Sequence, residues 1–438
     1  MAFATAVIMI HHRYTLLVLA LTALQGCANS PTAEAQLRGS QPIEAQEAQA
    51  ETIDSAISEE EAQQKRFEAW KTDFINRAAS KGYDRSLVEG ALRSATINER
   101  ALERDSDQPE FTKPVWSYVD NAVSVDRLNT GTAKLIENET VFNDVEARYH
   151  VPRHILTSIW GLETAYGRIM GTHDIISSLA TFAFEGRRTE FGEQQLFAVL
   201  DLLQKNEVRA DQLTGSWAGA MGMTQFIPTT FRDYAVDFNR DGNKNLWTDP
   251  YDALGSAAHY LSRHGWRKGE PVMTEVIVPT GFDYSLAETS TKTVDEWASL
   301  GVRPVTGQAW TEELGPLNAE MIAPAGHRGP IILTFKNFYV IKKYNNSTSY
   351  AMGITVLADA LRGVQTLKTD WPRGDEALSF DDKKAMQVKL TQLGFDTKGV
   401  DGQIGPNTRK AIRSWQKNNG LPADGYMEQI LFKRLMTS

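Results

Sequence analysis

Apolar residues recur at helical spacing through most of residues 65–270. The repeat is carried by Phe67, Trp70, Phe74 and Ile75 and, farther along, by Leu196, Leu200 and Leu203. Between residues 271 and 345 the pattern changes to short β-branched runs near Gly and Pro, at 276–278 and 331–333, which predict strands. Helical spacing returns at 350–361. The pattern predicts an α+β fold that is mainly α, with a small strand-rich insertion.

One predicted helix places a carboxylate among apolar residues. Pro152 suits a helix start, and Gly167 is expected to end the helix. The apolar face consists of Ile155, Ile159, Leu162 and Tyr166. At about 100° per residue, Glu163 falls inside this apolar arc. Burial raises the pKa of a carboxyl group, so Glu163 is a candidate proton donor to a leaving oxygen. Gly161 would admit a close neighbour. A structural Glu that caps a helix or pairs with a buried Arg is the alternative.

Length and composition describe a folded protein of more than one domain. The chain has 438 residues, which is too long for a single core, and 42% of them are hydrophobic, with ten Trp. The net charge is −9, and the acidic excess lies mostly in residues 28–64, so nothing indicates a nucleic-acid partner. No His or Cys cluster suggests zinc, and no Gly-rich phosphate loop is evident.

The N-terminus is typical of a targeting segment. Arg13 precedes a short apolar run at 16–24, which is too short to span a membrane. Leu24-Gln25-Gly26-Cys27 follows and resembles a bacterial lipobox, although Gln25 departs from the usual small or aliphatic residue. The resemblance implies a signal peptide at 1–27, lipidation of Cys27 and attachment to the inner face of the outer membrane, in the periplasm. Met9 is an alternative start to Met1. Cys27 is the only cysteine, so no internal disulfide forms.

Residues 28–64 are predicted to form a disordered acidic tether. They are rich in Ala, Glu, Gln and Ser and contain no aromatic residue. They hold eight acidic residues and one basic residue, Arg38. Such a composition is typical of a solvated linker, which would let an anchored protein reach the cell wall.

Two longer motifs carry a family resemblance. The segment 160–168 reads WGLETAYGR, and the segment 215–228 reads GSWAGAMGMTQFIP. Both resemble the lytic murein transglycosylase B family, the first as its catalytic segment and the second as its glycan-binding segment. Further similarity lies at Asn337-Phe338-Tyr339 and Tyr344-Asn345. The resemblance covers roughly residues 65–370 and implies a lysozyme-like catalytic domain.

The resemblance implies a reaction as well as a fold. In that family a single Glu, here Glu163, acts first as acid and then as base. The C6 hydroxyl of N-acetylmuramic acid attacks its own C1, so the MurNAc-β-1,4-GlcNAc bond breaks without water and leaves a 1,6-anhydroMurNAc end. No cofactor is needed for catalysis. The rivals are a hydrolytic muramidase, which would need a second carboxylate, and a non-catalytic wall-anchoring protein. Peptidoglycan strands are the expected partner, with the cell-wall synthesis machinery as a further candidate.

The same resemblance implies a set of substrate-binding residues. Ser216 would orient Glu163 or bind a sugar substituent, Gln225 would contact an N-acetyl group, and Phe226 would offer a stacking face. Tyr344 would donate a hydrogen bond to the acid. Asn345 and Tyr350 are the other implied cleft residues. Tyr118 and Tyr260 are further candidates to flank the groove, and Arg187 and Arg188 are candidates for substrate binding. The two arginines would pair with carboxylates of the substrate. The alternatives are a turn and a helix cap for Ser216 and Gln225, and a solvated surface pair for the arginines.

Residues 377–438, after a linker at 371–376, resemble a peptidoglycan-binding domain of three helices. The matching segments are 386–390, 393–395, 400–408, 411–416 and 421–425. An Asp-Gly pair recurs 23 residues on, at 401–402 and 424–425, and each Gly is predicted to form a positive-φ turn before a helix. A generic three-helix bundle is the alternative.

Residues 237–245 resemble the start of an EF-hand loop. Oxygen-bearing side chains occupy alternate positions, as calcium binding requires. They are Asp237, Asn239, Asp241 and Asn243. Position 12 would be Thr248, which departs from the bidentate Glu of that motif, while the family closes a longer loop with a later Asp, matched here by Asp252. A structural Ca²⁺ is one interpretation, and an Asx-rich turn without metal is the other.

Overall fold

The computed structural model describes residues 43–106, 114–186 and 188–438. The lipobox-like segment that ends at Cys27 lies outside these residues, as does Arg187. The chain divides into two units, 1–61 and 62–438, and the packing reported below is that of residues 62–438. In the described part of the chain, no helix combines the length and the apolar character needed to cross a membrane.

Helix α1 (Ile43–Ser80) corrects the predicted tether. Residues 43–64 are helical, so the prediction of disorder is wrong for that part of 28–64. Ala, Glu and Gln are strong helix formers, and a composition without aromatic residues suits a solvated helix as well as a linker. The C-terminal part of α1 is anchored by aromatic residues. Phe67 and Phe74 are fully buried, and the Phe67 ring centroid lies 5.3 Å from that of Phe184.

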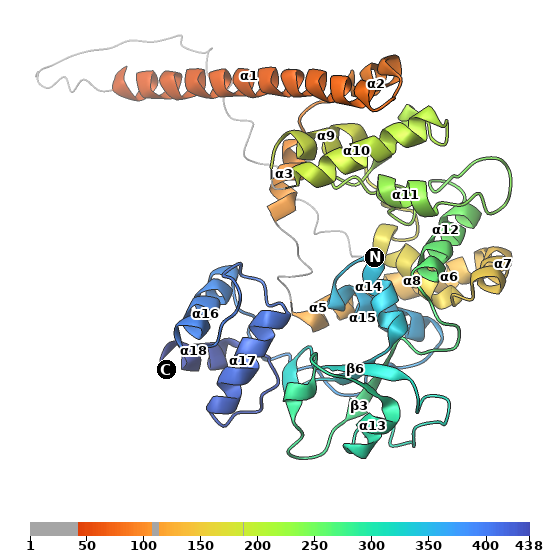
Figure 1. The fold of residues 1–438 in the computed structure, drawn as a ribbon, viewed down its shortest axis with the longest axis vertical. Coiled ribbons are helices and arrows are strands. Elements are labelled where there is room, and N and C mark those ends of the chain that lie inside the picture. Colours follow the sequence, from red (N-terminus) through yellow and green to blue (C-terminus); the bar gives the residue numbers. More distant parts are fainter. Residues whose placement is uncertain (1–42, 107–113, 187) are drawn as a thin grey trace, which may run out of the picture. The chain divides into compact units, whose positions relative to one another are not determined.

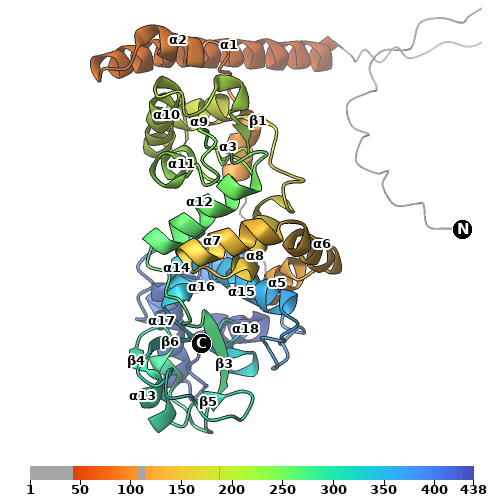
Figure 2. The ribbon, with the colours of Figure 1, turned by 90° about the vertical axis from the view of Figure 1, so that its right-hand side faces the viewer.

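Helices build most of residues 85–263, as predicted. They are α2 (Arg85–Leu92), α3 (Glu99–Ser106), α5 (Val115–Ala122), α6 (Val125–Glu137), α7 (Glu139–Tyr149), α8 (Arg153–Thr164), α9 (Ile175–Phe184), α10 (Thr189–Gln204), α11 (Pro228–Tyr234) and α12 (Pro250–Arg263). Strands β1 (His173–Asp174) and β2 (Thr214–Gly215) form a short antiparallel pair. α9 packs on α10, and α12 packs along α7 (Figures 1 and 2).

The strand-rich insertion forms one antiparallel sheet of order β4-β6-β7-β3-β5. Its strands are β3 (Met273–Ile277), β4 (Thr291–Thr293), β5 (Arg303–Pro304), β6 (Asn318–Ile322) and β7 (Ile331–Thr334). The two predicted runs are β7 and the end of β3, which pair with Val276 opposite Ile331. Helix α13 (Val294–Ser299) and a separate cluster around the buried Trp297 complete this small core. Figure 2 shows α13 beside the sheet.

Two further helices return the chain to the main core. They are α14 (Lys336–Tyr344) and α15 (Thr348–Leu361). α15 packs against both α5 and α8, so it brings a late segment of the chain into contact with two early helices. The predicted mainly α fold with a small strand-rich insertion is confirmed.

The C-terminal unit (residues 377–438) has three helices and its own core. They are α16 (Phe380–Gln392), α17 (Pro406–Asn418) and α18 (Gln429–Met436), packed around Trp415. The predicted positive φ angles are confirmed, at 72° for Gly402 and 79° for Gly425. The two Asp-Gly pairs also form the same hydrogen bonds. Gln387 donates through Nε2 to Asp401 and accepts through Oε1 from Gly402 N, and Gln416 repeats both bonds with Asp424 and Gly425.

Ion pairs join the C-terminal unit to the insertion along a boundary that we call the seam. Arg409 Nε and Arg413 Nη2 both donate to Glu288 Oε2, at 2.7 and 2.9 Å. His327 contacts Asp424 Oδ2 through its backbone N at 2.9 Å and its Nδ1 at 2.7 Å. The predicted linker is also held in place, because the Trp371 ring packs on Trp116 and Arg373 pairs with Asp120.

Candidate active site

Glu163 occupies the last turn of α8, whose middle residues are buried on every side. The predicted helix end is three residues too late, because α8 ends at Thr164 rather than at Gly167. Ala165 and Tyr166 enter the left-handed region, with φ of 48° and 62°. Their amides donate to Gly161 O and Trp160 O at 3.1 and 3.2 Å, which satisfies carbonyls at the helix end.

Gly161 admits a close neighbour, as predicted, and that neighbour is Tyr166. A Cβ on Gly161 would lie 2.7 Å from the Tyr166 Cζ atom, so only Gly fits. Tyr166 is 4% exposed and donates through its hydroxyl to Arg127 O at 2.8 Å. The predicted face of α8 therefore includes a residue that lies beyond the helix and folds back against it.

A tyrosine hydroxyl binds the half-buried Glu163 carboxylate. Tyr350, on α15, donates to Glu163 Oε1 at 2.6 Å. Tyr344 donates instead to the Thr224 carbonyl at 2.5 Å, so the predicted hydrogen bond from Tyr344 to the acid is wrong. Burial, followed by the charge of Glu163, raises the pKa of both phenols well above their usual value. Both therefore stay protonated and remain hydrogen-bond donors at neutral pH.

The segment 215–228 is tied to the end of α8. Thr164 Oγ1 donates to Met223 O at 2.7 Å and accepts from Gly167 N at 2.9 Å. Ser216 Oγ accepts from Ala220 N at 3.0 Å within a turn. The bond from Thr164 to Met223 O therefore holds the segment at the end of α8, next to Glu163.

Gln225 has a left-handed backbone, with φ of 52°. Its Nε2 atom donates to Met170 O at 3.2 Å and Gly222 O at 2.9 Å, so it does not cap a helix. Among the described residues its Oε1 atom accepts no hydrogen bond. The amide nitrogen of Gln225 therefore stabilises the local fold, whereas its Oε1 atom can accept a hydrogen bond from a ligand.

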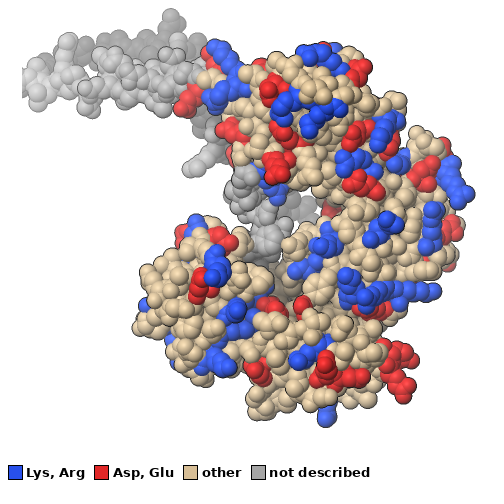
Figure 3. Space-filling model, viewed as in Figure 1, with Lys and Arg blue, Asp and Glu red and all other residues tan. Residues whose placement is uncertain are grey.

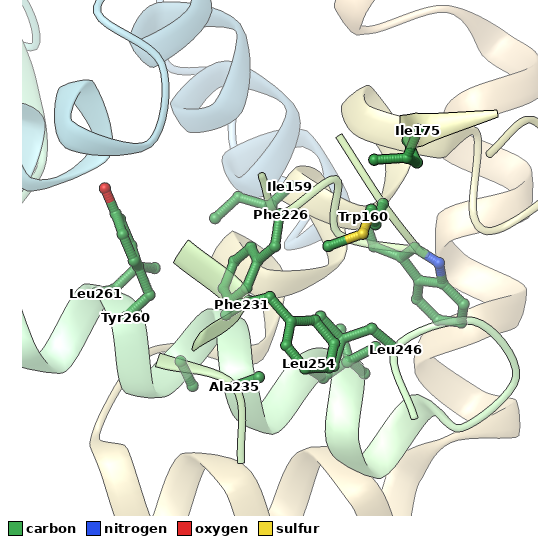
Figure 4. Packing of buried hydrophobic residues seen from close by; sticks show 14 of the residues in the cluster. Ile159, Trp160, Ile175, Phe226, Phe231, Ala235, Leu246, Leu254, Tyr260 and Leu261 are labelled. Atoms are coloured by element: carbon green, nitrogen blue, oxygen red, sulfur yellow. The ribbon is translucent and has the colours of Figure 1, made fainter. Parts of the chain in front are cut away.

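Two predicted cleft residues belong to the core. Phe226 is 2% exposed and packs against Tyr260 and Tyr344, so it has no face for a sugar, and the predicted stacking role is wrong. Figure 4 shows it directed into the buried cluster beside Phe231. Tyr260 is 8% exposed and donates to Lys343 O at 2.6 Å, so it supports Tyr344 from below and does not flank a groove.

The other predicted residues lie at different places around the site. Tyr118 is half-buried on α5. Asn345 follows α14, and its carbonyl accepts from Ser347 N at 2.8 Å. Arg188 is the residue before α10, with its guanidinium 5.3 Å from the Phe191 ring centroid.

The acidic loop after α11 gathers the predicted metal ligands. Carboxylate oxygens of Asp237, Asp241 and Asp252 lie within 4.8 Å of one another. Asp252 is fully buried and accepts from Phe238 N and Asn245 N, and burial raises its pKa. Sequence reasoning missed Asp249, which accepts from the Asn239 amide at 2.6 Å.

Such a set of hard oxygen ligands fits calcium. Asn239 and Asn243 lie in the same loop, where Asn239 Oδ1 accepts from Asp241 N and Asp241 Oδ1 accepts from Asn243 N. The same bonds are also expected in an Asx-rich turn without metal.

Charges of both signs are interspersed on the face of the molecule in Figure 3. That face shows no stripe of basic residues of the kind that binds nucleic acid.

Comparisons with known proteins cover both parts of the chain. Residues 66–359 match the family model described as transglycosylase SLT domain, and residues 381–435 match the putative peptidoglycan binding domain. The membrane-bound lytic murein transglycosylase B of Escherichia coli K12 is 32% identical over 304 residues, which are 66% of this chain and 81% of that protein.

Solved structures agree. SltB3 from Pseudomonas aeruginosa in complex with NAG-anhNAM-pentapeptide has a TM-score of 0.82 at 45% identity, covering 84% of this chain and 99% of that one. The E. coli lytic transglycosylase Slt35 in complex with calcium has a TM-score of 0.58 at 31% identity, covering 67% and 92% of the two chains.

Proposed function

This chain belongs to the transglycosylase SLT domain family and is a peptidoglycan lytic transglycosylase, and we propose that Glu163 is its catalytic acid and base. One observation carries the assignment. The hydroxyl of Tyr350, a residue that is 2% exposed, donates to Glu163 Oε1 at 2.6 Å. A hydrogen bond from a phenol suits a carboxyl group that changes its protonation state, because the phenol can donate to the carboxylate and accept from the carboxylic acid.

The proposed reaction has two proton transfers through Glu163. Protonated Glu163 gives its proton to the glycosidic oxygen between MurNAc and GlcNAc as the bond to C1 breaks. The C6 hydroxyl of the same muramic residue then attacks C1, and the Glu163 carboxylate takes the hydroxyl proton. The product carries a 1,6-anhydro end, and no water is consumed. An internal nucleophile is already positioned, which removes most of the entropic cost of attack.

We propose that the residues around Glu163 hold the sugar. Ser216 keeps its hydroxyl proton for a substituent, because its Oγ atom already accepts from Ala220 N. Gln225 offers Oε1 to an N-acetyl N–H. Tyr118 and Asn345 extend this surface, and Arg188, with Arg187, contacts acidic groups of the peptide stem.

Mass spectrometry of digested murein tests the reaction. Fragments about 18 Da lighter at the muramic end than hydrolytic products would establish the intramolecular route, because one water per cleavage is missing. Reducing ends would mean a hydrolytic muramidase with a second carboxylate. Murein that is bound but uncut would mean a wall-anchoring protein. The ligand of the related SltB3 complex contains anhydro-NAM and favours the first outcome.

We propose that the acidic loop holds a structural Ca²⁺ through Asp237, Asn239, Asp241, Asn243 and Asp252. The clustered carboxylates support this, and the related Slt35 was solved with calcium. At a hundredfold excess over Kd, calcium should stabilise the protein by about 2.7 kcal/mol. Differential scanning calorimetry with calcium and with chelator measures this. The Asp241→Asn variant should lose the response, and an identical response in the variant would contradict the site.

The location of the enzyme is also a proposal. The related E. coli protein is membrane-bound, and the lipobox supports lipidation of Cys27 and attachment to the outer membrane, where wall-synthesis enzymes are candidate partners. Labelled palmitate should enter the wild-type chain and not the Cys27→Ala variant. The C-terminal unit would bind the same wall, as its family match supports.

A further inference from the structure

A small hollow lies beside the proposed acid, at the C-terminal ends of α5 and α8. Its volume is about 70 Å³, and its lining consists of Tyr118, Asn121, Ala122, Arg127 and Leu162. Leu162 is the residue before Glu163. Tyr118 lies on α5, which packs along the helix that carries Tyr350. The hollow and the acid therefore share α8 as one wall, and α5 is the other.

Arg127, in the first turn of α6, fixes this corner. Its Nε atom donates to Gly161 O at 3.2 Å, and its Nη1 atom donates to Ala122 O at 3.1 Å and to Asn121 O. Its own carbonyl accepts from the Tyr166 hydroxyl. The guanidinium is thus held by carbonyls at the ends of two helices, where a cation is favoured.

The charge of Arg127 has no counterion in the structure. Among the described residues Arg127 forms no ion pair, although the adjacent Asp126 pairs with Arg168 at 2.7 Å. Its Nη2 atom donates to no described residue. A guanidinium has five N–H donors in a fixed plane, and a half-buried one with unused donors is suited to an oxygen-bearing ligand.

We propose that Arg127 and this hollow bind the lactyl group of the muramic residue whose bond is cleaved. The inference rests on the proposed function. The lactyl group is attached at C3, two carbons along the ring from the reacting C1, so it must lie near Glu163. Its carbonyl oxygen is an amide oxygen in strands that carry peptide stems and a carboxylate oxygen in stripped strands. Both accept hydrogen bonds from Nη2, and the carboxylate does so more strongly.

Ligand binding in a Glu163→Gln background separates this role from a structural one. A tetrasaccharide of alternating GlcNAc and MurNAc carries the lactyl group, and chitotetraose does not. Calorimetric titration should show that the Arg127→Gln change weakens binding of the muramic ligand roughly tenfold or more, the loss expected for a hydrogen bond from a charged donor. The affinity for chitotetraose should stay within about twofold.

Two variants keep the test decisive. Arg168→Gln removes a nearby exposed cation and should leave the ratio of the two affinities unchanged. If Arg127→Gln does not fold, Arg127→Lys, which retains charge without the planar fork, should still weaken the muramic ligand alone. An equal loss for both ligands, or no loss, would overturn the proposal. Failure of the proposed function would appear separately, as activity in the Glu163→Gln protein.

Discussion

Two glutamates of this chain, Glu163 in the candidate active site and Glu288 in the seam, are held in opposite ways. Glu288 accepts hydrogen bonds from Arg409 and Arg413, whose side chains are 31% and 6% exposed. Burial alone would raise the pKa of Glu288, but the two guanidinium groups outweigh it and hold the pKa below its usual value. Glu163 accepts instead from the neutral hydroxyl of Tyr350.

The difference separates a carboxylate that holds parts together from one that is suited to exchange a proton, as we propose for Glu163. Protonating Glu288 would leave two poorly solvated cations without a counterion, so its charge is fixed. A phenol can donate to a carboxylate and can also accept from a carboxylic acid, so Tyr350 can remain bonded to Glu163 in both states. The partners of a carboxylate, more than its burial, therefore indicate what it does.

The largest expected effect is on the rate when Glu163 is changed to Gln. We expect release of anhydromuramoyl products to fall by about 10³-fold or more, because general acid and base steps each contribute about 10²–10⁴-fold. The melting temperature should change little, since the amide oxygen can still accept from Tyr350. Product counting by mass spectrometry measures the rate, and the Glu288→Gln protein should retain its rate on soluble fragments. Full activity in Glu163→Gln would show that Glu163 is not the catalytic group, and the contrast with Glu288 would be lost.

The free energy of unfolding should respond in the opposite order, with a larger loss for a change at Glu288 than for one at Glu163. Glu288→Gln leaves Arg409 and Arg413 without their carboxylate, and we expect the free energy of unfolding to fall by about 2 kcal/mol. Breaking a fully buried pair costs about 3–5 kcal/mol, and Arg409 is partly solvated. Urea unfolding measures the loss. Glu89→Gln breaks an ion pair with Arg85 in which both side chains are about half exposed, and should cost less than about 1 kcal/mol. Equal losses would show that the seam is not special.

Acid should remove the contribution of Glu288. A carboxyl group whose folded-state pKa is lowered stabilises the protein above its unfolded-state pKa, here 4.5, and loses that contribution as pH falls through the folded value. The stability difference between wild type and Glu288→Gln should therefore be constant from pH 7 to about 5 and shrink below 4.5. Urea unfolding of both proteins at several pH values measures this. A difference that grows on acidification would have the wrong sign.

The helix of Glu163 could be predicted from sequence because its apolar spacing is regular and long. What could not be predicted is which tyrosine reaches the acid. Tyr344 and Tyr350 are six residues apart and straddle the break between α14 and α15, where Ser347 caps the second helix. The direction of each hydroxyl depends on how α15 packs on α8, and no local pattern records that contact.

The exposure of individual side chains could not be predicted from sequence either. Phe226 and Tyr260 lie in or near motif positions, but whether an aromatic ring faces sugar or core is set by neighbours far away in sequence. Arg127 was missed because its role depends on two helix ends meeting. Asp249 was missed although it stands before a Pro-started helix, a signal that could have identified a cap.

The smallest effect distinguishes the two tyrosines. Tyr350→Phe removes the donor to Glu163 and should lower kcat about tenfold, as expected for one hydrogen bond to a charged group. Tyr344→Phe should lower kcat by less than about threefold, because its hydroxyl serves Thr224 O, and should instead cost about 1 kcal/mol of stability by leaving that carbonyl unpaired. Steady-state rates on soluble murein fragments, with urea unfolding of both variants, measure the two effects. If Tyr344→Phe were the slower enzyme, the phenol that governs the acid would be Tyr344, and the contrast with Glu288 would have to be built on a different partner.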